Sequence, residues 1–342
     1  MKEKRIVTYI KNGKLVTKEF NFFSRKSIVY EIFDKPYIQG EHHEYYKINK
    51  EVTFLSLENI TFKKEARFIL TDHTSLILKG CNFKGGRLFL IGGSVELLEP
   101  RLNPCYYTNR IDISEVNKLN IIIDKENVSF ITIAGTAKDC LIDAEDRINQ
   151  IDINANNVHL KNMKEAKDLK IEADEILLDN CKLYTDIEKS TQNFETKSLT
   201  IKDSELIYQN MDESMEISAD LIHLQNSNIY FNDPSFVNGT IRSDKLKLEN
   251  SIIESSYVLN LPCQNIEMDE KSELKASRRI TFKNDTYCNK DDNNDLEITK
   301  QKLELLDTRR KFISILKGIE ESQKEETSQF TGKKKVRSKG NN

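Results

Sequence analysis

The stretch MEISADLIHLQNSNIYF, at Met215–Phe231, has a near-copy downstream, GTIRSDKLKLENSIIES at Gly239–Ser255. Further near-copies precede it, and each can be aligned on one apolar anchor. The anchors are Leu160, Leu178, Ile201, Leu224, Leu248 and Met268. Successive anchors lie roughly 20 residues apart, a repeat length that is typical of solenoid proteins.

Other columns of residues stay in register with these anchors. The position two residues before the anchor is always apolar: Val158, Ile176, Leu199, Ile222, Leu246 and Ile266. The position five before it is always small: Ala155, Ala173, Thr196, Ala219, Ser243 and Cys263. The position two after it is mostly Asn or Asp: Asn162, Asn180, Asp203, Asn226, Asn250 and Glu270. Asn and Asp tolerate the left-handed backbone of a corner, so this column predicts one corner in each copy.

Apolar and polar residues alternate within each copy, which is the signature of a β-strand. A unit of two or three short strands cannot bury its own apolar face, so the copies must stack. Stacked strands lie about 4.8 Å apart, which brings equivalent residues of successive coils into contact. We therefore expect Ile217 and Ile241 to be adjacent and buried, and the Asn side chains to form a ladder.

This repeat length, combined with an Asn ladder, resembles the right-handed parallel β-helix superfamily, which includes pectate lyases and phage tailspikes. The resemblance is to the fold only, and it implies an all-β, single-solenoid chain. We expect the solenoid over residues 51–290, with irregular coils to about 150 and regular repeats over 151–274. Upstream, LSLENITF at Leu55 and LILKGCNF at Leu76 share the motif at the repeat spacing. LFLIGGSVEL at Leu88 follows after little more than half that interval, so that coil is either irregular or wrongly counted.

The two ends depart from the repeat. Asn12-Gly13 lies between alternating segments and predicts a β-hairpin within an N-terminal cap, residues 1–50. Such a cap covers the open strand edges that would otherwise polymerise. At the other end, DDNND offers helix-capping residues before a predicted helix over 295–320.

The predicted helix carries an apolar stripe. Its members fall seven residues apart: Ile298, Leu305, Phe312 and Ile319. The stripe either docks on the solenoid or binds another chain. The polar segment 321–342 is expected to be disordered. Its basic run, Lys333 to Lys339, is the only hint of nucleic-acid binding, which we do not otherwise expect.

Composition excludes several other classes of protein. The net charge of −3, from 52 basic and 55 acidic residues, points to neither nucleic acid nor an anionic membrane. No run of about 18 apolar residues is present, so no membrane span is expected. The six cysteines are scattered without a CxxC pair, which predicts reduced thiols in a cytoplasmic protein and no zinc site. No cofactor is expected.

Two groups of acids are the candidates for chemistry. Asp220 and Asp244 are predicted to lie one coil apart, as a catalytic carboxylate pair or as corner residues of a charged surface. The segment KDCLIDAEDR groups four acids that either bind a cation or form a loop: Asp139, Asp143, Glu145 and Asp146. His159 and His223 are predicted to face outward in one column, three coils apart and too distant to share a metal ion.

These patterns favour a non-enzymatic scaffold or protein-binding solenoid, with either a protein partner or self-association. The fold resemblance implies two alternatives: a polysaccharide lyase or glycoside hydrolase, and a tailspike-like glycan-binding protein. A groove of aromatic side chains over paired acids would favour the enzyme. An apolar stripe on the outside of the coils would favour the tailspike-like trimer.

Overall fold

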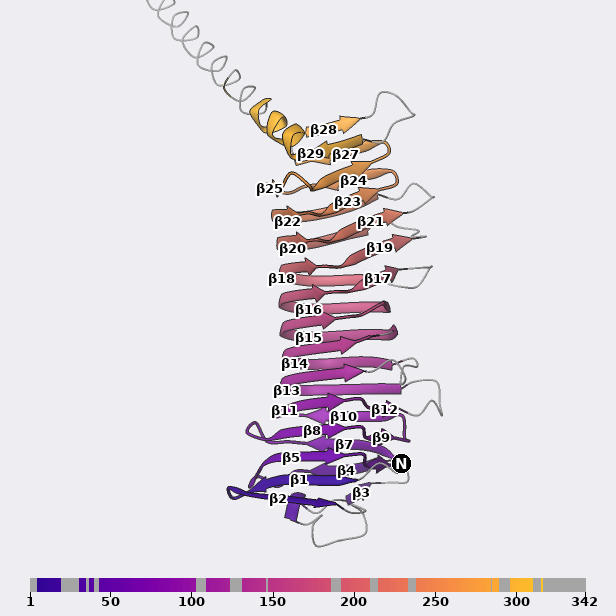
Figure 1. The fold of residues 1–342 in the computed structure, drawn as a ribbon, viewed down its shortest axis with the longest axis vertical. Coiled ribbons are helices and arrows are strands. Elements are labelled where there is room, and N and C mark those ends of the chain that lie inside the picture. Colours follow the sequence, from indigo (N-terminus) through magenta and orange to yellow (C-terminus); the bar gives the residue numbers. More distant parts are fainter. Residues whose placement is uncertain are drawn as a thin grey trace, which may run out of the picture.

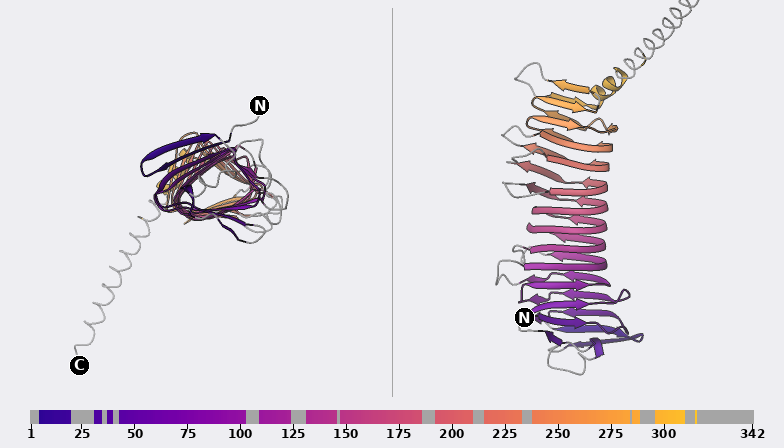
Figure 2. Two further views of the ribbon diagram at one scale, coloured as in Figure 1. Left: turned by 90° about the horizontal axis from the view of Figure 1, so that it is seen from below. Right: turned by 180° about the vertical axis from the view of Figure 1, so that it is seen from behind.

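The chain forms a slender rod of stacked coils (Figure 1). The computed structural model describes residues 5–19, 31–34, 37–39, 43–102, 109–123, 131–145, 147–185, 192–209, 215–232, 238–283, 285–288, 296–309 and 315. Seen along the axis of the rod, successive coils superimpose (Figure 2). This is the parallel β-helix that the repeat predicts, with one helix near the C-terminus.

Three parallel faces make up the rod. The first contains β4 (His43–Lys47), β7 (Glu65–Ile69), β10 (Arg87–Ile91), β24 (Val258–Leu261) and β27 (Arg279–Phe282). It also contains the first halves of several long strands, which are named at the end of this paragraph. The second contains β5 (Val52–Glu58), β8 (Ser75–Lys79), β11 (Ser94–Leu98), the second halves of the long strands, and β25 (Asn265–Met268). The long strands bend from one face to the other: β13 (Asn109–Ile123), β14 (Ile131–Ala144), β15 (Arg147–Lys161), β16 (Glu165–Asp179), β18 (Gln192–Lys202), β20 (Met215–Gln225) and β22 (Asn238–Glu249).

The third face consists of short strands in two groups. Near the N-terminus they are β6 (Thr61–Phe62), β9 (Asn82–Phe83) and β12 (Arg101–Leu102). Further along they are β17 (Lys182–Thr185), β19 (Glu205–Gln209), β21 (Asn228–Asn232), β23 (Ile252–Ser255) and β26 (Glu273–Ala276).

One aliphatic ladder runs through the second face from end to end. Each member pairs with the next in parallel register: Leu57, Leu78, Leu97, Ile121, Ile142, Leu160, Leu178, Ile201, Leu224, Leu248 and Met268. At about 4.8 Å a step, its ten steps span about 48 Å. The six predicted anchors are all members, and Ile217 pairs with Ile241 with both side chains buried. The predicted register is therefore confirmed.

The apparently short interval between Leu76 and Leu88 was a wrong count. Leu88 lies in β10 on the first face, whereas Leu76 lies in β8 on the second. The true counterpart of Leu76 is Val95, and the ladder passes through Leu97. Strands on two different faces resemble two coils because both share the same alternating pattern, although only the short third-face strand β9 separates them.

The Asn column occupies a left-handed corner, as predicted. Asn162, Asn180, Asp203, Asn226 and Asn250 all have φ between 48° and 58°. Side-chain amides link successive coils: the Nδ2 of Asn180 donates to Asn162 Oδ1 at 2.7 Å, and the Nδ2 of Asn250 donates to Asn226 Oδ1 at 3.0 Å. The corner is thus held by backbone conformation and by an amide ladder.

A buried hydroxyl repeats directly after this corner. Ser227 Oγ accepts the backbone N–H of Ser204 at 3.1 Å, and Ser251 Oγ accepts that of Ser227 at 3.1 Å. All three serines are buried. Each such bond satisfies a polar group that the narrow core would otherwise leave unpaired.

The same corner is present in coils upstream of the regular repeats, and the last copy of the repeat departs from it. Upstream it is occupied by Asn59, Gly80 and Glu99, all with positive φ. A Cβ on Gly80 would lie 2.5 Å from Asn59 Oδ1, so glycine leaves room for the neighbouring amide. Downstream, the assignment of Glu270 to this column was wrong. Asp269 accepts the backbone N–H of Asn250 instead, at 2.9 Å, because the chain turns directly after β25.

Both ends of the rod finish in antiparallel strands. At the N-terminal end, β1 (Ile6–Lys11) runs antiparallel to β5 and to β2 (Lys14–Glu19), and β3 (Tyr37–Gln39) runs antiparallel to β4. The β1–β2 turn uses Asn12 and Gly13 at positive φ, as the predicted hairpin requires. At the C-terminal end, β28 (Asp285–Cys288) and β29 (Leu296–Thr299) run antiparallel to β27 and β26. A reversed strand cannot template another parallel coil.

The C-terminal helix begins later than predicted, at residue 300, and is described to residue 309. Ile298 lies in β29, where it pairs with Leu274 and is buried. Leu303 and Leu306 are the buried residues of the helix, whereas Leu305 is 69% exposed. The predicted helical stripe through Ile298 and Leu305 is therefore wrong, because Ile298 lies in a strand and Leu305 in the helix that follows it. Phe312, Ile319 and the basic run Lys333 to Lys339 lie outside the described residues.

Replacing Ile222 by Asp should abolish soluble expression. The Ile222 side chain is fully buried in the ladder beside the anchor column. An unpaired carboxylate there costs several kcal/mol, a large part of the roughly 5–15 kcal/mol that stabilises a domain. The control is His223→Gln, one residue along on the outer side, which should express normally. Equal loss from both variants would mean that the two sides of the strand are misassigned.

The corner column predicts an unequal response to two substitutions at Asn226. Asn226→Gly removes the amide links but accepts φ of 49° freely, and should destabilise by about 1 kcal/mol. Asn226→Ala adds the left-handed strain and should cost about 2 kcal/mol. Urea denaturation of both variants measures the difference. A glycine variant less stable than the alanine variant would contradict the conformational role of this corner.

Candidate functional site

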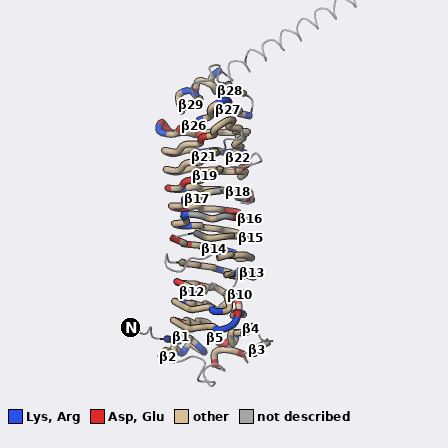
Figure 3. Tube along the Cα trace, turned by 90° about the vertical axis from the view of Figure 1, so that its right-hand side faces the viewer, with Lys and Arg blue, Asp and Glu red and all other residues tan. Residues whose placement is uncertain are grey.

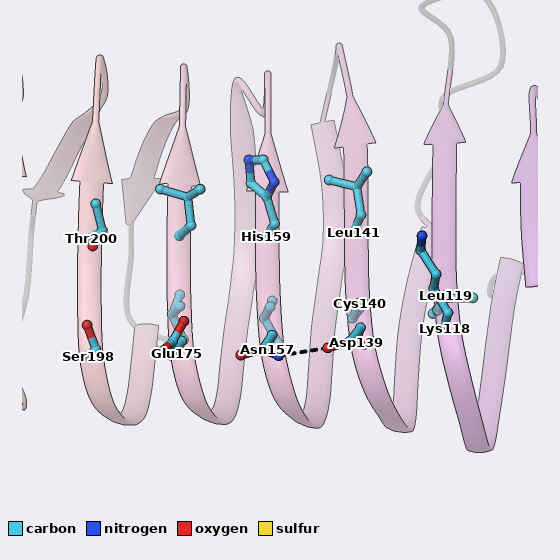
Figure 4. A pocket seen from close by; sticks show the side chains of 13 residues that line it. Lys118, Leu119, Asp139, Cys140, Leu141, Asn157, His159, Glu175, Ser198 and Thr200 are labelled. Atoms are coloured by element: carbon cyan, nitrogen blue, oxygen red, sulfur yellow. Dashed lines mark hydrogen bonds between the residues drawn. The ribbon is translucent and has the colours of Figure 1, made fainter. Parts of the chain in front are cut away.

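A groove of about 430 Å³ crosses the outer side of the second face, from β13 to β18. Its first row lies beside the bend of each strand: Lys118, Asp139, Asn157, Glu175 and Ser198. Its second row lies two residues further along each strand: Leu141, His159, Leu177 and Thr200. Figure 4 shows the two rows, which run across successive strands of the second face.

The rows exist because the strands stack in parallel register. Asp139 pairs with Asn157, and Asn157 with Glu175, so the first row repeats once per coil. In the second row, Leu141 pairs with His159 and His159 with Leu177. The alternation that sends every other residue inward leaves these residues on the outside. The groove is therefore apolar at Leu141 and Leu177 and polar along the first row.

The acids of the groove are not arranged as a catalytic pair. Asp139 Oδ1 accepts a hydrogen bond from Asn157 Nδ2 at 2.7 Å. Glu175 lies two coils from Asp139, about 9.6 Å on the ladder spacing, with Asn157 between them. None of the groove's lining residues is Phe, Tyr or Trp. The combination that would favour a carbohydrate-active enzyme, aromatic side chains over paired acids, is not present in this groove.

His159 is the titrating group in the second row. Its Nε2 lies 3.7 Å from Asp179 Oδ2. Burial lowers the pKa of His159 below its usual value, and the neighbouring Asp179 opposes that shift only in part. His223 occupies the same outward column three coils away, with Nε2 at 3.3 Å from Glu249 Oε2. The two histidines therefore have separate carboxylate partners.

Asp220 and Asp244 lie at the bend between the first and second faces, beside a second hollow of about 810 Å³. Both are exposed, and they fall on adjacent coils. Gln264 Nε2 donates to Asp244 Oδ1, while the nearby Arg242 Nε lies 2.6 Å from Glu216 Oε1. The surroundings are those of a charged corner, and the two interpretations of this pair, corner residues or catalytic carboxylates, both stay untested.

Two of the acids of KDCLIDAEDR, Asp139 and Asp143, lie apart along one strand. Asp139 and Asp143 are four residues apart in β14, about 13 Å in an extended chain. Asp143 Oδ1 accepts from Asn162 Nδ2 at 2.7 Å, which extends the Asn ladder by one coil. Glu145 is exposed beyond the end of β14, and Asp146 lies outside the described residues. Within the described part of the chain, no group of three or more His, Cys, Asp or Glu is placed to hold a metal ion.

Comparisons of the chain with protein-family models, with curated proteins and with solved structures find no match. In the part of the chain that is described, no helix is long and apolar enough to cross a membrane. In the view of Figure 3, blue segments of Lys and Arg and red segments of Asp and Glu are scattered along the length of the rod. The groove itself was missed by sequence reasoning, although the outward column three residues before each anchor would have shown its first row.

The lowered pKa of His159 predicts a pH-dependent stability. In the unfolded chain this imidazole takes up a proton near pH 6.5, whereas in the folded chain it does so only at lower pH. The unfolded state therefore binds more protons in this window, and stability falls as pH drops below about 6.5. His159→Gln should unfold with a shallower pH dependence between pH 7 and 5, measured by urea denaturation. An unchanged slope would contradict the burial of His159 as the cause.

Proposed function

We propose that the protein is a non-enzymatic, cytoplasmic binding rod whose groove holds an extended segment of a protein partner. The groove carries this proposal, because it combines apolar side chains with polar groups along one edge. Leu141 and Leu177 offer contacts for apolar side chains of a peptide. Asn157 and Ser198 offer donors and acceptors for its backbone, which an extended peptide leaves unpaired.

The lining of the groove favours a peptide over a glycan. Sugar rings are commonly held on the flat rings of Trp, Tyr or Phe, and the lining residues include none of these three. The first row instead carries both signs of charge, with Lys118 beside Asp139 and Glu175 further on. Mixed charges select a partner by electrostatic complementarity more than they add affinity. A partner segment with apolar side chains and charges of both signs fits this arrangement.

The ends of the rod support a scaffold that acts singly and does not polymerise end to end. Antiparallel strands close the first face at both ends. The outermost N-terminal strand, β2, carries Lys14 and Lys18, and charged residues on an edge strand disfavour further pairing. The lateral surface is then the surface available to partners.

The described cysteines support the cytoplasmic assignment. Cys81, Cys140, Cys181 and Cys263 are free and buried, and burial raises the pKa of each thiol. Buried neutral thiols are inert, and unpaired cysteines are usual in a reducing compartment.

The tailspike-like alternative is less well supported. Large apolar side chains that are exposed within the described residues are few and scattered: Leu15, Ile122, Leu305 and Ile315. They belong to the N-terminal hairpin, one strand of the second face and the C-terminal helix, so they make no continuous stripe along the coils. A trimer that packs rods side by side needs such a stripe.

The groove can be tested with a random peptide library displayed on phage. Peptides selected on the unmodified protein should lose at least about tenfold in affinity for the double variant Leu141→Asp, Leu177→Asp, because two apolar contacts are replaced by charges. The control is Leu15→Asp, an exposed leucine of the N-terminal hairpin away from the groove, which should bind as before. Circular dichroism verifies that all variants fold.

Two results would overturn the proposal. The first is a set of selected peptides that bind the double variant as well as the unmodified protein. The second is turnover of an acidic or neutral polysaccharide by the purified protein, lost on Asp220→Asn with Asp244→Asn. That outcome would replace the binding rod with a carbohydrate-active enzyme.

A further inference from the structure

A second surface feature lies on the first face near the N-terminal end, away from the groove. Three outward residues of adjacent strands, Tyr45, Arg67 and Phe89, stand in one column and pair in parallel register. The Arg67 Cζ lies 5.2 Å from the centre of the Tyr45 ring and 4.0 Å from that of Phe89. The guanidinium is therefore held between two aromatic rings.

Arg67 differs from the other cations of this cluster in having no acidic partner. Arg87 Nη2 lies 3.1 Å from Asp112 Oδ2, and Arg110 Nε lies 2.6 Å from Asp112 Oδ1. The remaining acid, Glu65, is 2.8 Å from His43 Nδ1 through its Oε2. Among the described residues, none forms an ion pair or hydrogen bond with Arg67, and its Nε is buried without a partner.

The charge of the cluster leaves a surplus cation. Three arginines face two carboxylates, and His43 adds a further positive charge only when protonated. Phe89 also has Arg87 near its ring, at 4.8 Å, so the aromatic column brings two guanidinium groups close together. Arginine stacked on an aromatic ring keeps its in-plane N–H groups in a fixed fork, which matches the two oxygens of a carboxylate or phosphoryl group.

We propose that the Tyr45–Arg67–Phe89 column is a binding site for an oxyanion, a carboxylate or a phosphoryl group borne by a ligand. The two rings supply orientation by holding the guanidinium plane. Arg67 supplies the paired hydrogen bonds, and Arg87 and Arg110 add a favourable field. This site lies on a different face from the groove, so it does not depend on the peptide-binding proposal.

The site can be tested by magnetic resonance of the arginine side-chain Nε–Hε groups in the full-length protein. Inorganic phosphate and acetate, each added at constant ionic strength, should shift the Arg67 signal with a saturating curve. That signal is assigned by its absence from Arg67→Lys. Tighter binding of acetate identifies a carboxylate ligand and tighter binding of phosphate a phosphoryl ligand. Both results support the site.

Arg278 provides the matched internal control. It also stacks on a ring, with its Cζ 5.2 Å from the centre of Tyr257, but its Nη1 donates to the Tyr257 hydroxyl. Its signal should shift only slightly when either anion is added, and the shift should not saturate.

A second readout is the set of backbone signals around Tyr45 and Phe89. In Arg67→Lys, the anion affinity measured from their titration should fall by about tenfold or more, because one charge-assisted hydrogen bond is lost. An Arg67 signal that behaves like that of Arg278, or a titration unchanged by Arg67→Lys, overturns the proposal.

Discussion

Parallel stacking of coils in one register is the constraint on which this molecule depends. A coil of two or three short strands has an apolar inner side that only the neighbouring coils can cover. The aliphatic ladder of the second face, from Leu57 to Met268, shows how strictly that requirement is met. A shift of one residue in any coil would turn its inner side chains outward, because side chains alternate along a strand. The corner holds this register, since a residue with positive φ turns the backbone there in coil after coil.

The same stacking creates the surfaces proposed for binding. Residues at one outward position of successive coils form a row, so a surface feature repeats along the axis and suits an elongated ligand. The groove is made of two such rows, and the aromatic column around Arg67 is a third on another face. The antiparallel strands at the ends limit this repetition to the length of one chain. Within the described residues, the first face ends in antiparallel strands at both ends of the rod, whereas the second face finishes at β25.

The amino-acid sequence by itself determined the coil fold, its register from Leu160 to Met268, the left-handed Asn corner and the N-terminal hairpin. These features are local or periodic, because alternation, spacing and turn residues can all be recognised within one or two copies of the repeat. The helical stripe of Ile298 and Leu305 was predicted wrongly, because the pattern does not say where a strand ends and a helix begins. The coil at Leu88 was left open as irregular or wrongly counted, because an alternating pattern does not say which face a strand joins.

Only the tertiary structure decided which outward residues meet. Lys118, Asp139 and Glu175 come from three coils, and the column around Arg67 comes from three others. The predicted anchors place Asn157 beside Glu175, but Lys118, Asp139 and the column around Arg67 lie upstream of those anchors, where the register between coils was not predicted. Burial of the interior constrains inward columns strongly, whereas outward columns are free to vary, so the fold was readable from the repeat and the binding surfaces were not.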